Sequence, residues 1–251
     1  MTIHHFTASD GIRLAYRIVG DDNPRNLLLI HGLYSNGEMN WIKFGHAQKL
    51  ADAGFRVILP DLRAHGKSEA PHDPAAYPDD VLARDTEELI AHLGLTDYDL
   101  GGFSLGARTT VRLLMRGAKP KKVILGGMGL EGLTGWSGRK QFFLDAIDHY
   151  DIANRGTPWF MVVSFMKTMK IDREGARHLL STFTDTDPEA LKTITQPVLV
   201  VCGTEDEDNG SAPKLAEALP NATYAPIPGT HMSSVTEGEL GDAMVKFLKD
   251  A

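Results

Sequence analysis

The sequence predicts an α/β protein built on a mostly parallel, eight-stranded sheet with helices on both faces. Three observations carry this prediction. Short apolar runs alternate with longer stretches in which apolar residues recur at helical spacing, as is typical of βαβ units. Polar, glycine-bearing segments follow several of the apolar runs, so one edge of the sheet would collect them. An aromatic-rich stretch interrupts the alternation and indicates a helical insertion.

The expected elements are short and follow one another closely. The first two strands form a hairpin around the turn Ser9-Asp10-Gly11, a sequence typical of tight turns. The eight strands are expected at residues 3–7, 12–19, 26–30, 56–59, 98–104, 121–127, 196–203 and 223–229. Helices are expected at residues 79–93, 105–116, 212–219 and 237–249.

Residues 129–190 form the predicted insertion. They hold eight of the chain's 19 aromatic residues, together with Met161, Met166 and Met169. We expect this segment to form a helical cap over the sheet edge, inserted after the sixth strand. The core domain would then comprise residues 1–128 and 191–251.

The composition excludes several classes of function. The 251 residues carry a net charge of −7, and the basic runs Lys119–Lys122 and Arg139-Lys140 are interpreted as solvated surface, so no nucleic-acid partner is expected. The lone Cys202 lies in an apolar run and is expected to be a buried strand residue. With neither a signal-peptide segment nor an apolar stretch long enough for a membrane helix, we expect a cytoplasmic protein without a membrane partner. The oligomeric state is not predicted.

Ser104 is the first candidate for chemistry. It stands in Gly102-Phe103-Ser104-Leu105-Gly106, between an expected strand and an expected helix. Gly-x-Ser-x-Gly in this context predicts a sharp turn that exposes the serine hydroxyl, with glycines where a side chain would clash. A serine hydroxyl is a weak nucleophile at neutral pH and requires a base.

His231 is the preferred base among ten histidines. It follows the last expected strand, in "PIPGTHMSS", so its loop can reach the same sheet edge as Ser104. His65, in "DLRAHGKS", is also expected near the sheet edge, but it is the second choice because it has no obvious orienting acid. His46 and His72 are assigned to variable-looking loops.

The acid that orients the base is expected in "GTEDEDNG", which follows another strand. Asp206 is preferred, and Asp208 is a competitor. The run also suggests calcium, but aligning Gly210 with the glycine of an EF-hand loop leaves Ala216 where the bidentate glutamate belongs. No metal site is therefore predicted.

The order Ser104, Asp206, His231 and the motifs "LLLIHGL", "DLRAHGKS" and "GFSLG" make the sequence similar to the α/β-hydrolase family over nearly its whole length. The resemblance implies a Ser–His–acid triad beneath a helical cap. It also implies an oxyanion hole made by the backbone N–H groups of Leu33 and Leu105. "DLRAHGKS" departs from the commoner family form at Ala64-His65, where a loop-shaping role is expected.

The activity expected from this resemblance is cleavage of an ester-like acyl bond through an acyl-enzyme, with no cofactor. An apolar cap suggests a small, largely apolar ester or lactone substrate. The same triad would serve a lactonase, thioesterase, perhydrolase or carbon–carbon bond hydrolase, although no polar cap group suited to the last is evident. A non-catalytic ligand-binding protein on this fold is the alternative from another class. The expected pocket residues are Phe103, Trp136, Phe143, Trp159 and Met232.

Overall fold

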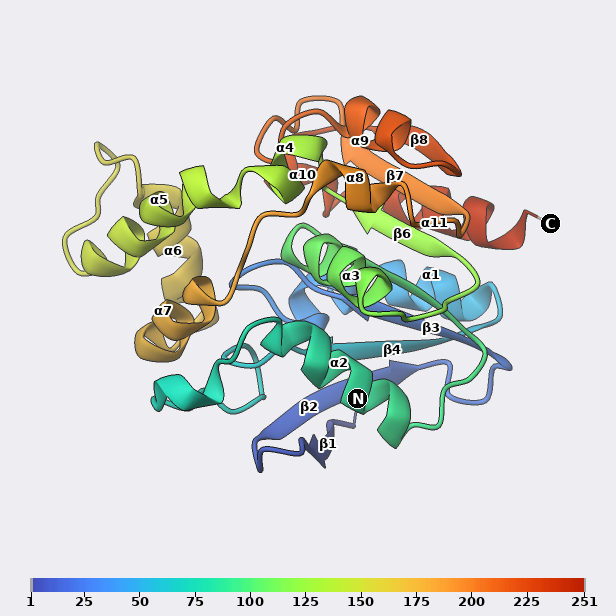
Figure 1. Cartoon of the computed structure of the whole chain (residues 1–251), viewed down its shortest axis with the longest axis horizontal. Helices are drawn as coiled ribbons and strands as arrows, with labels where there is room; N and C mark the ends of the chain where they lie inside the picture. The colour runs from blue at the N-terminus through green and yellow to red at the C-terminus, as the bar shows by residue number, and fades with distance from the viewer. Residues whose placement is uncertain (1, 251) are drawn as a thin grey trace.

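A single mixed sheet organises the molecule (Figure 1). The structure is a computed structural model, which describes residues 2–250. Its eight strands lie in the order β1-β2-β4-β3-β5-β6-β7-β8, with β1 and β2 antiparallel to their neighbours and the others parallel. The strands are β1 (His4–Thr7), β2 (Arg13–Val19), β3 (Arg25–Ile30), β4 (Phe55–Asp61), β5 (Tyr98–Phe103), β6 (Val123–Gly126), β7 (Val198–Gly203) and β8 (Ala222–Ile227). The predicted fold class is confirmed.

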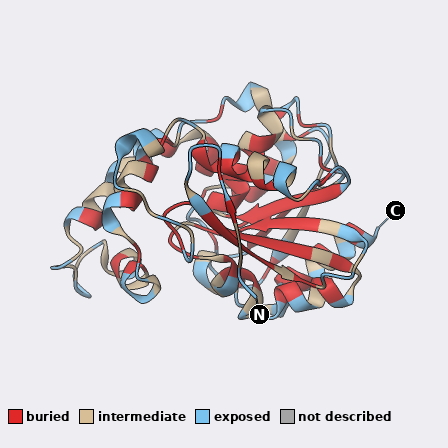
Figure 2. Ribbon diagram, turned by 90° about the horizontal axis from the view of Figure 1, so that it is seen from below, coloured by how far each residue is buried: buried red, intermediate tan, exposed pale blue. Residues whose placement is uncertain are grey.

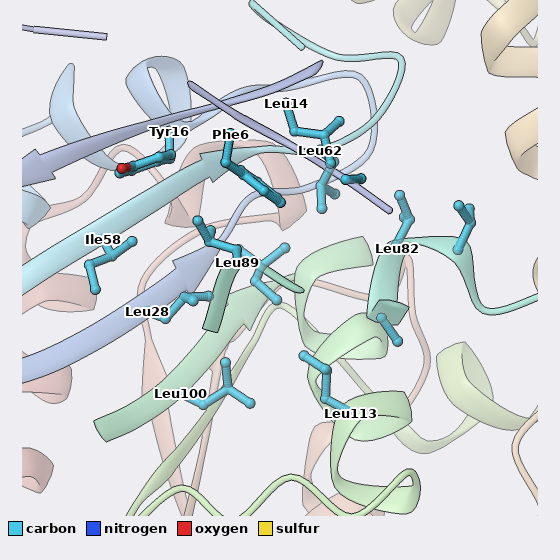
Figure 3. Close-up of a cluster of buried hydrophobic side chains, with 14 of the residues drawn as sticks. Phe6, Leu14, Tyr16, Leu28, Ile58, Leu62, Leu82, Leu89, Leu100 and Leu113 are labelled. Carbon is cyan, nitrogen blue, oxygen red and sulfur yellow. The ribbon is translucent and has the colours of Figure 1, made fainter. Parts of the chain in front are cut away.

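Helices cover both faces of the sheet, which explains why the central strands are apolar on both sides. One face packs on α2 (Val81–His92), α3 (Leu105–Met115) and α9 (Ala212–Ala218), and the other on α1 (His46–Asp52) and α11 (Gly238–Lys249). Along β3, Leu28 joins the cluster of α2 and α3, whereas Leu27 and Leu29 join the cluster of α1 and α11. This alternation is the two-residue period of a strand. Figure 3 shows the first of these clusters, which includes Leu28 on β3, Leu89 on α2 and Leu113 on α3.

A helical region follows β6. Its helices are α4 (Leu130–Thr134), α5 (Trp136–Asp148), α6 (Phe160–Met169), α7 (Arg173–Ser181) and α8 (Pro188–Leu191). Helices α5, α6 and α7 project beyond one end of the sheet (Figure 1), and they expose more surface than strands β2 to β7, which are buried along most of their length (Figure 2). A helical region in the predicted position is thus confirmed, while the division into a core domain and a cap at residues 129 and 190 stays a prediction.

The sequence missed the short elements between β3 and α2. A π-helical turn, η1 (Glu38–Ile42), precedes α1, and a 3₁₀ turn, η2 (Pro74–Ala76), follows β4. His46 begins α1 and is buried, so its assignment to a loop was wrong. The helix lacks an ordinary start signal because its N-cap is Gly45, which makes no side-chain capping hydrogen bond.

Candidate active site

Ser104 occupies a strained turn between β5 and α3. Its φ of 54° and ψ of −111° lie outside the regions that L-residues usually adopt, a conformation that persists only where the surroundings enforce it. Those surroundings require glycine: a Cβ on Gly106 would lie 2.1 Å from the Ile30 carbonyl oxygen, and one on Gly102 would lie 2.3 Å from the Gly106 carbonyl carbon. The glycines flanking Ser104 are therefore there to permit the bend, as expected from the sequence.

Ser104, His231 and Asp206 meet at the sheet edge, although 127 and 25 positions separate the bonded pairs in the sequence. His231 Nε2 lies 3.0 Å from Ser104 Oγ, and His231 Nδ1 lies 2.8 Å from Asp206 Oδ2. The three side chains follow β5, β7 and β8, whose carboxyl ends share one edge. His231 begins the short helix α10 (His231–Ser234), which is fixed by a capping box between Thr230 and Ser233.

Asp206 is held ionised at this position. Burial favours its neutral form, but hydrogen bonds and the charge interaction with His231 outweigh burial and hold the pKa of Asp206 below its usual value. The Cys202 thiol donates to Oδ2 at 3.3 Å, and the backbone N–H of Asp208 donates to Oδ1 at 3.2 Å. Since a carboxylate only accepts, His231 must carry its proton on Nδ1, which leaves Nε2 free to accept the Ser104 proton.

The competing acid lies outside this arrangement. The Asp208 side chain is exposed, and its contact with Asp206 is made by its backbone N–H. The structure therefore brings Asp206, and not Asp208, to the histidine.

The backbone around Leu33 has the form expected of an oxyanion-binding turn. Gly32 lies against Ser104, since a Cβ there would be 3.6 Å from Ser104 Cβ. The N–H of Gly32 donates to Asn40 Oδ1 at 3.0 Å, and that of Tyr34 donates to His65 Nε2 at 2.9 Å. Between them, the N–H of Leu33 donates to no protein acceptor among residues 2–250.

Leu105 offers the second free N–H. It is the first residue of α3, and the first N–H groups of a helix have no partner within the helix. Leu33 and Leu105 thus each have a backbone N–H that donates to no acceptor among residues 2–250, and their function as an oxyanion hole remains a prediction.

Two buried histidines build this turn and take no part in the hydrogen bonds of Ser104. His31 Nε2 accepts from the N–H of Leu62 at 3.0 Å, while His65 accepts from Tyr34 as described above. Each ring lies 2.8–2.9 Å from a carbonyl oxygen through Nδ1, so both are neutral with the proton on Nδ1. Burial lowers the pKa of both, that of His65 to about 3. His65, the second choice as base, is occupied in shaping the loop.

The expected pocket residues are spread over several environments. Trp136 and Phe143 stack at 5.5 Å in an apolar cluster that also contains Tyr34 and Phe183. Phe103 is buried in the core, where its ring packs 5.1 Å from that of His231.

The two other expected pocket residues lie apart from this cluster. Trp159 stacks on His149 at 3.9 Å elsewhere in the helical region, and Met232 is half-exposed beside His231. Contact of any of the five residues with substrate remains a prediction.

Three contributors to the site were not identified from the sequence. Asn209 is buried with its carboxamide 3.4 Å from Ser104 Oγ, and Arg139 of α5 donates to Asn209 at 2.5 Å. Arg139 was interpreted as solvated surface and is in fact half-buried, so a polar cap group does reach the site. Cys202 is the buried strand residue expected, yet its thiol also holds Asp206. The only feature of the sequence that could have indicated Asn209 is its position directly after "EDED", in the loop expected to supply the acid.

Neither a membrane-spanning helix nor a cluster of metal ligands accompanies this site in residues 2–250. Between residues 2 and 250, no helix is both long and apolar enough to span a membrane. Over the same range, no group of three or more His, Cys, Asp or Glu side chains could hold a metal ion.

Solved structures share this architecture over almost the whole chain. An esterase from Exiguobacterium antarcticum superposes with a TM-score of 0.80, at 20% identity, over 99% of this chain and 100% of its own. An enol-lactonase from Burkholderia xenovorans LB400 superposes with a TM-score of 0.75, at 24% identity, over 98% of this chain and 100% of its own. A family model of the alpha/beta hydrolase fold matches residues 25–125. The chain has the α/β-hydrolase fold.

The proteins that this chain resembles are named after different reactions. The non-heme chloroperoxidase CPO-A1 of Kitasatospora aureofaciens is 27% identical to this chain, over 86% of this chain and 87% of its own length. Because identities of this size are compatible with an esterase, a lactonase or a haloperoxidase, the reaction must be argued from the site.

Proposed function

We propose that this α/β-hydrolase is a serine hydrolase that cleaves carboxylic ester-like bonds through an acyl-enzyme. The observation that supports it is the hydrogen-bonded series Ser104 Oγ, His231 and Asp206, with distances of 3.0 and 2.8 Å. Asp206 accepts the hydrogen bond from His231 Nδ1, so Nε2 faces Ser104 Oγ as the acceptor that nucleophilic catalysis requires.

The reaction would proceed in two halves. Ser104 Oγ attacks the substrate carbonyl carbon while its proton passes to His231 Nε2. The carbonyl oxygen takes the negative charge and is stabilised by the free N–H groups of Leu33 and Leu105, each worth about 3 kcal/mol in the transition state. His231 then protonates the departing alkoxide. In the second half, His231 takes a proton from water, the water oxygen attacks the acyl carbon, and Ser104 regains its proton as the acid leaves.

Two features support this reaction class over others. A serine at position 104 suits acyl transfer, whereas a haloalkane dehalogenase or epoxide hydrolase of this fold would be expected to carry aspartate there. The apolar cluster of Tyr34, Trp136, Phe143 and Phe183 supports a small, largely apolar acyl or alcohol group. A lactone is the alternative substrate, since its opening uses the same steps.

The test is turnover of p-nitrophenyl acetate by the parent and by Ser104→Ala. We expect kcat/KM to fall by roughly 10³-fold or more, because the acyl-enzyme can no longer form. Ser137→Ala is the matched control, since Ser137 is a hydrogen-bonded serine of α5 that has no place in the proposed mechanism. A Ser104→Ala protein as active as the parent would contradict the proposal. A panel of esters, lactones and thioesters, tested also with hydrogen peroxide as the acyl acceptor, then separates the alternatives.

A further inference from the structure

Asn209 is a buried residue that joins the nucleophile to the helical region. It lies in the loop after β7, three positions beyond Asp206. Its Nδ2 donates to the Gly127 carbonyl oxygen at 2.8 Å and to Ser104 Oγ at 3.4 Å. Its Oδ1 accepts from Arg139 Nη1 at 2.5 Å. One carboxamide thus contacts the reacting oxygen on one side and a cap side chain on the other.

The orientation of this carboxamide is fixed by chemistry. A guanidinium only donates hydrogen bonds and a carbonyl oxygen only accepts them, so Oδ1 must face Arg139 and Nδ2 must face Gly127. Rotating the amide by 180° would break both contacts. Since the Ser104 proton is directed to His231 Nε2, Ser104 Oγ is left to accept from Nδ2.

Arg139 is the unusual partner in this arrangement. Arg173 and Arg177 of the helical region pair with carboxylates, whereas no ion pair links Arg139 to a carboxylate within residues 2–250. Its guanidinium lies 5.9 Å from the centre of the Phe143 ring, beside the apolar cluster. Burying a charge without a paired carboxylate costs free energy, and the hydrogen bond to Asn209 offsets part of that cost for Arg139.

A backbone contact fixes the same loop. The N–H of Gly132, in α4, donates to the Asn209 carbonyl oxygen at 2.7 Å. Gly132 has no room for a side chain, since a Cβ there would lie 2.7 Å from Asn209 Cβ. The base of the helical region therefore holds the Asn209 backbone while α5 holds its side chain.

We propose that Asn209 is a further catalytic residue and that Arg139 is its positioning residue. This inference rests on the proposed function. When the Ser104 proton moves to His231 Nε2, negative charge develops on Oγ, and the Asn209 N–H stabilises it without giving up its own proton. The same contact stabilises Oγ again as it leaves the acyl carbon in the second half. The helical region would thereby set the reactivity of the nucleophile as well as cover it.

The first test is the second-order rate constant for inactivation by a fluorophosphonate, which measures the reactivity of Ser104 directly. Asn209→Ala should react about tenfold more slowly than the parent, the effect of losing one hydrogen bond of ordinary strength. With p-nitrophenyl acetate the loss should fall on kcat, with KM nearly unchanged. Asn23→Ala is the matched control, because Asn23 also donates to backbone carbonyls, those of Ala51 and Phe55. It should react at the parent rate.

The outcomes separate this inference from the proposed function. A parent that does not react at all would remove the proposed function. A reactive parent with Asn209→Ala within twofold of it would overturn the inference alone. If Asn209→Ala does not fold, Asn209→Asp replaces it, because the aspartate keeps the shape and the Arg139 contact but loses the donor. It too should react at least tenfold more slowly, and a parent-like rate would overturn the inference.

A double-mutant cycle tests the positioning residue. Arg139→Met should slow inactivation several-fold in the parent, because the carboxamide loses the partner that orients it. In the Asn209→Ala background the same change should have no effect on that rate. An equal effect in both backgrounds would show that Arg139 acts on the substrate independently of Asn209, and would overturn its assignment as the positioning residue.

Discussion

At the scale of residues, the site depends on which polar side chains are buried. Asp206 and Asp208 are two positions apart in one acidic loop, and the sequence favoured Asp206 without excluding Asp208. In the fold Asp206 is buried against Cys202 and His231, while Asp208 is exposed. Burial strengthens the Asp206–His231 contact because the local dielectric is low.

This difference predicts unequal effects of two identical substitutions. Asp206→Asn should lower kcat for p-nitrophenyl acetate by about 10³–10⁴-fold, because an amide no longer enforces the His231 tautomer with Nε2 free. Asp208→Asn removes the same charge from the same loop and should change kcat less than about threefold, since an exposed carboxylate is screened by solvent. Steady-state kinetics of both variants at pH 7 measure the effect. The reverse ranking would move the triad acid to Asp208.

At the scale of elements, the loops after β3 and β4 are joined by neutral histidines. His31, after β3, accepts from the backbone that follows β4, and His65, after β4, accepts from Tyr34 after β3. Tyr34 has a φ of 61°, which is a strained conformation for a residue other than glycine. The two reciprocal hydrogen bonds of His31 and His65, called the histidine lock below, hold this turn next to the Leu33 N–H. The "DLRAHGKS" motif was expected to shape a loop, and the hydrogen bonds of His65 support that interpretation.

The histidine lock predicts a loss of stability in acid. Burial lowers the pKa of His65 from 6.5 to about 3, so below pH 6.5 the unfolded chain binds a proton that the folded chain does not. The stabilisation is complete above pH 6.5 and is lost as the pH falls towards 3. His65 alone should lower the free energy of unfolding by about 2 kcal/mol between pH 7 and pH 5.

Urea unfolding of the parent and of His65→Gln at both pH values isolates this contribution. The variant should lose about 2 kcal/mol less than the parent between pH 7 and pH 5, whatever its stability at pH 7. Equal losses in the two proteins would show that His65 is not the group that titrates.

The predictable elements were those with strong local signals. Several strands carry apolar runs that end at or next to glycine or proline, as at Gly20, Gly126 and Pro228, and α3 follows directly from the elbow motif. Helix α1 was missed because Gly45 provides no cap, and α5 likewise begins at Gly135 without a side-chain cap. Such helices are held by packing against neighbours distant in the sequence, which a single sequence does not reveal.

At the scale of the whole molecule, the sheet brings Ser104, Asp206 and His231 together at one edge, and the helical region adds Arg139, which reaches them through Asn209. Ser104, Asp206 and His231 could be predicted together because the parallel strands before them end at one edge. The contact between Arg139 and Asn209 could not be predicted, because 70 positions separate the two residues in the sequence. Arg139-Lys140 also has the sequence of a solvated surface pair, although the Arg139 side chain is half-buried. The esterase and the enol-lactonase share the overall fold with this chain, so the fold by itself does not select the reaction.

The central claim is that Ser104 is the nucleophile, and identification of the residue labelled by a fluorophosphonate tests it most directly. Mass spectrometry of the digested protein should find one adduct per chain, on the peptide that contains Ser104, and no adduct in Ser104→Ala. Prior denaturation should also abolish labelling, because the reactivity comes from His231 and the folded turn. An adduct on another residue, or equal labelling of Ser104→Ala, would contradict the account.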